Sequence, residues 1–104
     1  MSKKQILDEF TNILAVALRH KIGNIVNPNE IYAEKYAKDS EILFKQAEKI
    51  KEQRNWNYRD KVEIKQKLIR KLRKELEEKD FLPDEKYKHM DPEIEKALKQ
   101  LGLL

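Results

Sequence analysis

The stretch NWNYRDKVEIKQKLIRKLRK, residues 55–74, combines the chain's one tryptophan with its densest run of positive charge. From Arg59 through Lys74, eight Lys or Arg side chains stand against two acidic ones, a net charge of +6. The whole chain carries only +4. Apolar residues recur here at the spacing of an amphipathic helix. Asn57 is a suitable N-cap with Asp60 at the third helical position, so we predict a helix from Asn57 to about Lys79.

On a helical wheel this segment divides into an apolar arc and a broad cationic face. The apolar arc is predicted to hold Tyr58, Val62, Leu68, Ile69, Leu72 and Leu76. The cationic face holds Arg59, Lys67, Arg70, Lys71, Arg73 and Lys74. Lys61 and Lys65 lie inside the apolar arc. Either their long side chains extend to solvent, or the first turn projects beyond the bundle, or an acidic group faces them.

Two helices are predicted on the N-terminal side of this segment. Residues 3–22 carry an apolar stripe that includes Phe10 and Leu14, and Gly23 follows as a helix stop. The motif Asn27-Pro28-Asn29-Glu30 is typical of a helix start, with Asn27 as the cap. The second helix is predicted to carry the stripe Ile31, Tyr32, Tyr36, Leu43, Ala47 and Ile50, with a kink or restart at residues 38–40.

The C-terminal segment has a second start signal of the same kind. Asp91 is the predicted cap, Pro92 the first helical residue and Gly102 the stop, with the stripe Ile94, Ala97, Leu98 and Leu101 between them. Residues 81–90 form either a short helix that begins at Pro83 or a loop. No β alternation occurs, so we predict an all-α fold, a single domain over residues 1–104 with four or five helices. Its predicted core includes Phe10, Leu14, Leu43, Ala47, Ile69, Leu72 and Leu76.

Composition bounds the possible functions. A chain of 104 residues with 39% hydrophobic content can form one small core. Because it contains no cysteine, disulfides, thiolate metal sites and a cysteine nucleophile are excluded. The longest apolar run, residues 13–18, is far shorter than the ~20 residues of a membrane span. No signal-peptide core follows the first residues, so we expect a cytoplasmic protein that does not enter the membrane.

Signals for catalysis are mostly missing. The two glycines stand far apart, which excludes a glycine-rich phosphate loop. His20 and His89 lie on different segments without metal-ligand spacing, so we expect neither a metal nor another cofactor. Arg19 and His20 point about 100° apart on a helix and cannot converge as the Arg and His of helical ribonuclease toxins do. We therefore expect no catalytic residues and no enzymatic activity of the chain on its own.

The cationic face is either a solvated surface or a contact for phosphates or an acidic protein. Acidic residues are scarce on it before Glu75, so pairs along the helix cannot neutralise it. The absence of interleaved aromatic residues argues against stacking on single-stranded nucleic acid. Trp56, at the junction of the second and third helices, is predicted to staple them together. The alternative is that it anchors a partner.

Residues 44–85, FKQAEKIKEQRNWNYRDKVEIKQKLIRKLRKELEEKDFLPDE, resemble the C-terminal helical region of the motor (HsdR) subunit of type I restriction-modification enzymes. In both, a helix enters a tryptophan, and a run of alternating Leu/Ile and Lys/Arg leads to an aromatic residue, a proline and an acidic residue. The positions similar in kind are Trp56, Arg59, Lys61, Val62, Lys67, Leu68, Arg70, Leu72, Lys74, Phe81, Pro83 and Asp84.

The resemblance implies a role in docking. In that family the helical C-terminus attaches the translocating, ATP-hydrolysing and nuclease domains to the methyltransferase core. The helicase and nuclease motifs lie elsewhere in the family, and none is present here. We therefore expect a non-catalytic docking domain of a DNA-processing assembly whose partner is a protein, the methyltransferase core. The alternative is a small independent nucleic-acid-binding protein that contacts the phosphate backbone with residues 67–74.

Overall fold

Four α-helices and one short 3-10 helix follow one another in the computed structural model, which describes residues 1–29, 31 and 33–104. They are α1 (Lys3–Val26), α2 (Ala33–Lys51), α3 (Tyr58–Glu77), η1 (Asp84–His89) and α4 (Met90–Gln100). No strand occurs among the described residues. The predicted all-α fold is confirmed. The segment that the sequence left open, residues 81–90, contains the short helix η1 just after Pro83.

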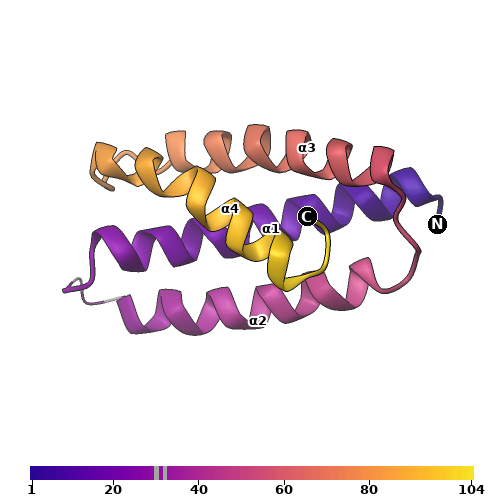
Figure 1. Ribbon diagram of the computed structural model, residues 1–104. Coiled ribbons are helices and arrows are strands. Elements are labelled where there is room, and N and C mark those ends of the chain that lie inside the picture. Colours follow the sequence, from indigo (N-terminus) through magenta and orange to yellow (C-terminus); the bar gives the residue numbers. More distant parts are fainter. Residues whose placement is uncertain (30, 32) are drawn as a thin grey trace.

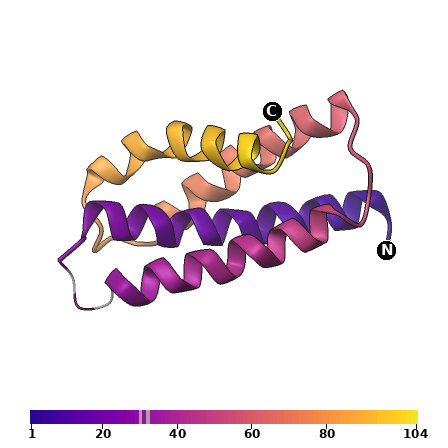
Figure 2. The same cartoon turned by 60° about the horizontal axis from the view of Figure 1, so that its bottom comes forward.

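The helices are arranged around α1, the longest of them (Figure 1). Figure 2 shows α2 on one side of α1, and α3 with α4 on the other. Within the described part of the chain, the backbone of α2 lies close to α1 alone, whereas the backbone of α3 also lies close to α4 and η1. The resulting bundle measures 40 × 22 × 21 Å. α1 is therefore the element that joins α2 to the rest of the molecule.

The core is close to the predicted one. Of the seven residues expected there, Phe10, Leu14, Ala47, Leu72 and Leu76 are buried in one cluster. Ile69 is half-buried and packs against that cluster. Leu43 is also only half-buried and lies outside it. The reason is that α2 has a single helix to pack against, so residues on its flanks are left partly in solvent.

The start of α3 follows the prediction closely. The Asn57 side chain accepts a hydrogen bond from the Asp60 backbone N–H at 2.9 Å, and the Asp60 carboxylate accepts one from the Asn57 N–H at 3.0 Å. These two bonds form a reciprocal capping box. A capping box of the same kind, made by Ser2 and Gln5, begins α1.

The apolar arc of α3 is rotated from its predicted position. Its buried residues are Ile64, Leu68, Leu72 and Leu76, so the prediction missed Ile64. Tyr58 and Val62, expected inside, are 82% and 39% exposed. The buried residues are spaced by four, so their row turns by about 40° around the helix at each step, and near the start of α3 it lies away from Tyr58 and Val62. Lys61 and Lys65 share the direction of the buried leucines and are half-buried.

Two predicted helix boundaries near the α1–α2 connection are wrong. Gly23 does not stop α1, which continues to Val26. Asn27 does not cap α2; its backbone N–H donates to Gly23 O at 3.0 Å and closes α1 instead. Ile31 of the predicted stripe is 86% exposed. Glu30 and Tyr32 of the same predictions lie outside the described residues. The restart offered as one alternative at residues 38–40 is also wrong, because α2 is helical throughout that stretch.

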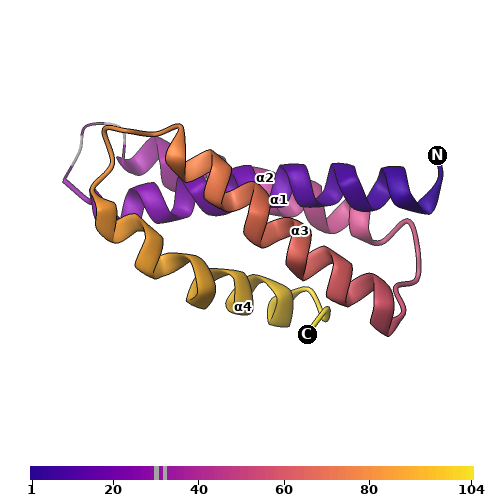
Figure 3. The ribbon, with the colours of Figure 1, turned by 90° about the horizontal axis from the view of Figure 1, so that it is seen from above.

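The C-terminal helix begins earlier than predicted and ends as predicted. Asp91 is not the cap, because η1 runs directly into α4 and His89 occupies the cap position without a side-chain hydrogen bond. Pro92 lies in the first turn, where its missing N–H has no intrahelical partner to lose. Gly102 adopts a φ of 72°, and Leu103 N–H donates to Leu98 O at 2.8 Å. This is the Schellman ending that favours glycine. It turns the chain back beside the first turns of α3 (Figure 3).

Candidate interaction surface

The six predicted contact residues of α3 fall into two groups. Arg59, Arg70, Arg73 and Lys74 are exposed. Lys67 and Lys71 are not, since only 17% of each side chain is accessible. The difference follows from their place on the helix: these two lysines lie at the edge of α3 that meets α1. The predicted cationic face is therefore divided between an interface inside the protein and a free surface.

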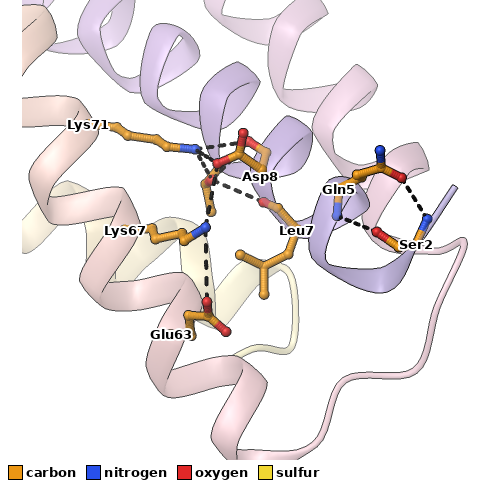
Figure 4. Close-up of polar contacts among 8 residues, drawn as sticks. Ser2, Gln5, Leu7, Asp8, Glu63, Lys67 and Lys71 are labelled. Carbon is orange, nitrogen blue, oxygen red and sulfur yellow. Dashed lines mark hydrogen bonds and ion pairs between the residues drawn. The ribbon is translucent and has the colours of Figure 1, made fainter.

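Lys71 is held by three oxygen atoms of α1 (Figure 4). Its Nζ donates to Asp8 Oδ1 at 2.8 Å, to Asp8 O at 3.0 Å and to Thr11 Oγ1 at 2.7 Å. Thr11 is fully buried, and its hydroxyl donates in turn to Leu7 O at 3.0 Å. These bonds tie the middle of α3 to the first half of α1.

Lys67 adds to the same arrangement. Its Nζ lies 3.5 Å from Asp8 Oδ1 and 3.9 Å from a carboxylate oxygen of Glu63. The hydrogen bond and the charge of Lys71, together with the charge of Lys67, hold the pKa of Asp8 below its usual value of 3.8. Asp8 thus carries a negative charge between two lysines of the facing helix.

The expectation that pairs along the helix cannot neutralise the cationic face considered α3 alone, and Lys67 and Lys71 have their partner on α1. The neutralising group is Asp8, about sixty residues away in the sequence. Spacing along one helix identifies partners three or four residues apart and cannot find such a group. A second link of this kind joins Arg19 to Glu75, with Nε and Oε2 3.4 Å apart. The orientation of these two atoms leaves Arg19 Nε without a hydrogen bond.

The free part of the face is a short ridge formed by Arg70, Arg73 and Lys74, here called the α3 ridge. No ion pair joins these three side chains to a carboxylate within the described ranges. Beside the ridge lies a groove of about 540 Å³ between α1 and α3. Its lining residues are Asn12, Ala15 and Val16 from α1, and Arg70, Lys71, Lys74, Glu75 and Glu78 from that end of α3. The ridge therefore offers positive charge beside a groove of mixed charge.

Trp56 lies where the staple prediction places it. Its indole is half-buried and packs against the core, and its Nε1 donates to Lys51 O at the end of α2 at 2.7 Å. Lys3 Nζ lies 5.5 Å from the ring centroid, in cation–π range. The side chain therefore satisfies a carbonyl at the end of α2 and connects α1, α2 and α3.

The other candidates for chemistry are separated. Arg19 and His20 diverge as predicted, since Arg19 reaches toward α3 and His20 toward α2. The His20 Nδ1 donates to Val16 O at 2.8 Å. The imidazole ring lies edge-on to the Tyr36 ring, with the two ring centroids 5.7 Å apart. The described residues contain no group of three or more His, Asp and Glu side chains positioned to bind a metal ion.

Comparison with protein-family models, with curated proteins and with solved structures finds no match to this chain. Within the described part, none of the helices combines the length and apolar composition needed to cross a bilayer. Inferences about function therefore depend on the geometry above and on the sequence resemblance of residues 44–85.

Proposed function

We propose that this protein is a non-catalytic docking domain that binds an acidic protein surface through the α3 ridge. The observation that supports this most directly is the division of the cationic face. Lys67 and Lys71 fix α3 to α1, while Arg70, Arg73 and Lys74 remain exposed on the helix that they hold in place. A charged surface on a fixed helix loses little entropy on binding, which favours recognition.

The shape of the ridge favours a protein over a nucleic acid. Residues 70 and 74 are separated by about 6 Å along the helix axis, at 1.5 Å per residue. Affinity for duplex DNA normally comes from several phosphate contacts spread along the backbone. Glu75, Glu77 and Glu78 follow the ridge, so the positive surface ends within one turn and does not continue along a phosphate backbone. A compact cluster of carboxylates is the better complement to three adjacent cations.

The resemblance of residues 44–85 to the C-terminal helical region of the type I motor protein supports a DNA-processing assembly as the setting. On this proposal the partner is the methyltransferase core of a type I restriction enzyme. The helicase and nuclease steps belong to other domains of such an assembly, and this chain contributes attachment alone. The similarity lies mainly in the helix pattern around Trp56 and the basic run after it.

Replacing the ridge by glutamine tests the proposal. Salt bridges at the centre of an interface and the anchor residues around them often decide affinity. The triple variant should therefore bind the methyltransferase core about tenfold more weakly, or less tightly still. It combines Arg70→Gln, Arg73→Gln and Lys74→Gln. Binding would be measured by calorimetry against the methyltransferase core of a type I enzyme from the same organism, and by fluorescence anisotropy against a short DNA duplex.

The matched control removes the same charge elsewhere. Lys35, Lys38 and Lys49 are exposed on α2, and their replacement by glutamine should leave binding to the core unchanged. Loss of core binding in the ridge variant alone supports the proposal. Binding to duplex DNA that falls steeply with salt, without binding to the core, would show instead that the protein contacts nucleic acid. Binding to neither partner overturns the docking role.

A further inference from the structure

The layer formed by α2, α1 and α3 is covered by a helix on one face only. Figure 1 shows these helices one above another, with α4 in front of them. Seen from above, α4 stays on that side, and α3 slants across α1 so that its C-terminal half lies on the other side (Figure 3). None of the described helices covers α1 on the side away from α4. We call this side, with exposed Asn12 and half-buried Val16, the open face of α1.

The end of α3 supplies positive charge along one edge of the open face. Arg70 and Lys74 of the α3 ridge line the groove between α1 and α3 together with Asn12. Neither cation forms an ion pair within the described ranges. Of the two carboxylates in this groove, Glu75 is already paired with an arginine of α1, and Glu78 lies one turn beyond Lys74. The positive charge that has no partner is therefore concentrated beside Asn12.

α2 supplies apolar side chains along the other edge. Phe44 lies on the flank of α2 nearest α4, because it lines a groove with Ala97 and Gln100 of that helix. At 100° per residue, Leu43 and Ile42 are turned from Phe44 by about 100° and 160°, toward the side away from α4. Ile42 is 56% exposed, and Leu43 is half-buried outside the core cluster. α2 thus leaves apolar surface in solvent beside the open face.

The segment after α3 closes one end of the open face. Gly23 follows Val16 by two turns on the same side of α1, and the nearest atoms to a Cβ there belong to the side chains of Tyr36 and Leu82. Phe81 lines a small depression at the same place and is 61% exposed. Exposed apolar side chains that gather along one face are typical of interaction surfaces.

A helix is the occupant that this face fits best. The described residues contain no strand, so they offer no sheet edge to which an extended segment could add. α4 shows that the layer accepts a helix, since it packs against α1 and α3 on the opposite face. An amphipathic helix can present apolar side chains on one flank and charged ones on the other. The open face has apolar surface from α2 and positive charge from α3 on opposite sides of α1.

On the basis of the docking role above, we propose that the acidic partner places an amphipathic helix on the open face of α1. The apolar side chains of this helix pack against Val16, Ile42 and Phe81. Carboxylates on its other flank lie beside Arg70 and Lys74. The partner surface that the α3 ridge recognises is then a helix with one apolar and one acidic flank.

Replacing exposed apolar residues tests the open face separately from the ridge. The double variant Ile42→Gln, Phe81→Gln should bind the methyltransferase core about tenfold more weakly by calorimetry, as expected when apolar anchors are lost. The double variant Tyr58→Gln, Leu104→Gln is the matched control. Its side chains are 82% and 55% exposed, at the start of α3 and at the C-terminus, which lie on the α4 side in Figure 3. It should leave the Kd unchanged.

Asn12 provides a test of the sign of the charge on the helix. It is exposed on the open face and lines the groove with Arg70 and Lys74, so a new side chain there meets the partner without entering the core. Asn12→Lys should tighten binding to the core about threefold, and Asn12→Glu should weaken it by a similar factor. Circular dichroism would verify that each variant is folded.

Weaker binding of both the ridge variant and the Ile42→Gln, Phe81→Gln variant supports the helix site. Loss of binding in the ridge variant alone overturns the helix site and leaves the docking role in place. An equal loss in the Tyr58→Gln, Leu104→Gln control also overturns it. Absence of binding by the parent overturns the docking role and the helix site together. If the Ile42→Gln, Phe81→Gln variant does not fold, the two Asn12 variants decide, and equal affinities overturn the proposal.

Discussion

At the scale of single residues, Lys71 shows how one side chain can belong to a charged surface in the sequence and to an interface in the fold. It has the same charge and the same helix as Lys74. Lys71 donates three hydrogen bonds to α1, whereas Lys74 is exposed. A rotation of about 60° around the helix separates these two roles, since the two residues are three positions apart.

The contact between Asp8 and Lys71 should make stability depend on acid. The pKa of Asp8 is below its usual 3.8 in the folded protein, first because Lys71 donates a hydrogen bond to it. The ionised carboxylate therefore stabilises the fold above pH 3.8, and this contribution is lost as the pH falls through the lower folded-state pKa. Urea denaturation across this range should show a smaller loss of stability on acidification for Asp8→Asn than for the parent.

Two lysine variants sharpen this measurement. Lys71→Met removes the main cause of the shift and should also reduce the acid dependence, whereas Lys74→Met should retain all of it. Asp60, whose pKa is lowered by Lys3 and by the Asn57 backbone, contributes equally to all these proteins. The interpretation is wrong if Asp8→Asn and the parent lose the same stability between neutral pH and the acid limit.

At the scale of helices, a residue predicted to begin or end a helix does so where no adjacent helix already includes it. The capping box of Asn57 and Asp60 begins α3 as predicted. Gly102 ends α4 as predicted, with a positive φ. Both helix ends face solvent. Asn27 carries an equally good start signal, yet it follows α1 so closely that it closes that helix instead. Asp91 loses its role because η1 already supplies helical backbone before it.

Gly23 gives a direct test of one wrong boundary. It lies inside α1, and a Cβ there would meet the Tyr36 side chain at 3.7 Å and the Leu82 side chain at 3.9 Å, which is ordinary contact. Since glycine inside a helix is less favourable than alanine by roughly 0.5–1 kcal/mol, Gly23→Ala should raise the free energy of unfolding by about that amount. Thermal and urea denaturation would measure it.

Gly102 is the matched position with the opposite expectation. Its φ of 72° is one that alanine rarely adopts, although no atom lies within 4 Å of an added Cβ. Gly102→Ala should therefore destabilise by roughly 1 kcal/mol through backbone strain alone. A destabilised Gly23→Ala would mean that α1 does not continue through residue 23 as a regular helix.

The division of the candidate surface could be predicted only in part. Amphipathic spacing identified α3 and its cationic face, because that information lies in consecutive residues. The pairing of Asp8 with Lys71 depends on the packing of α1 against α3, which no local pattern specifies. The surroundings of Lys61 depend on the return of the C-terminal turn beside the start of α3, again a long-range feature.

At the scale of the whole molecule, the helices are unequally supported. α1 is covered from two sides, and α3 and α4 pack against each other as well as against α1. The backbone of α2 lies close to α1 alone, and its buried residues are only Ala33 and Ala47. Isolated helices of this length are marginal in water, so the stability of α2 depends on the contact with α1.

This asymmetry predicts that α2 opens separately from the rest of the bundle. Native-state hydrogen exchange should show α2 amides exchanging through an opening that costs about 1 kcal/mol or more below the opening of the buried middle of α1. The α2 opening should also respond less steeply to low denaturant, since it exposes less surface than global unfolding. α4 is the internal control. It is shorter than α2, yet Ile94 and Leu98 are buried, so its amides should exchange with those of α1. If α2 and α1 share one free energy and one denaturant slope, the contact between them is strong enough to make the molecule a single cooperative unit, and the expectation drawn from burial is wrong.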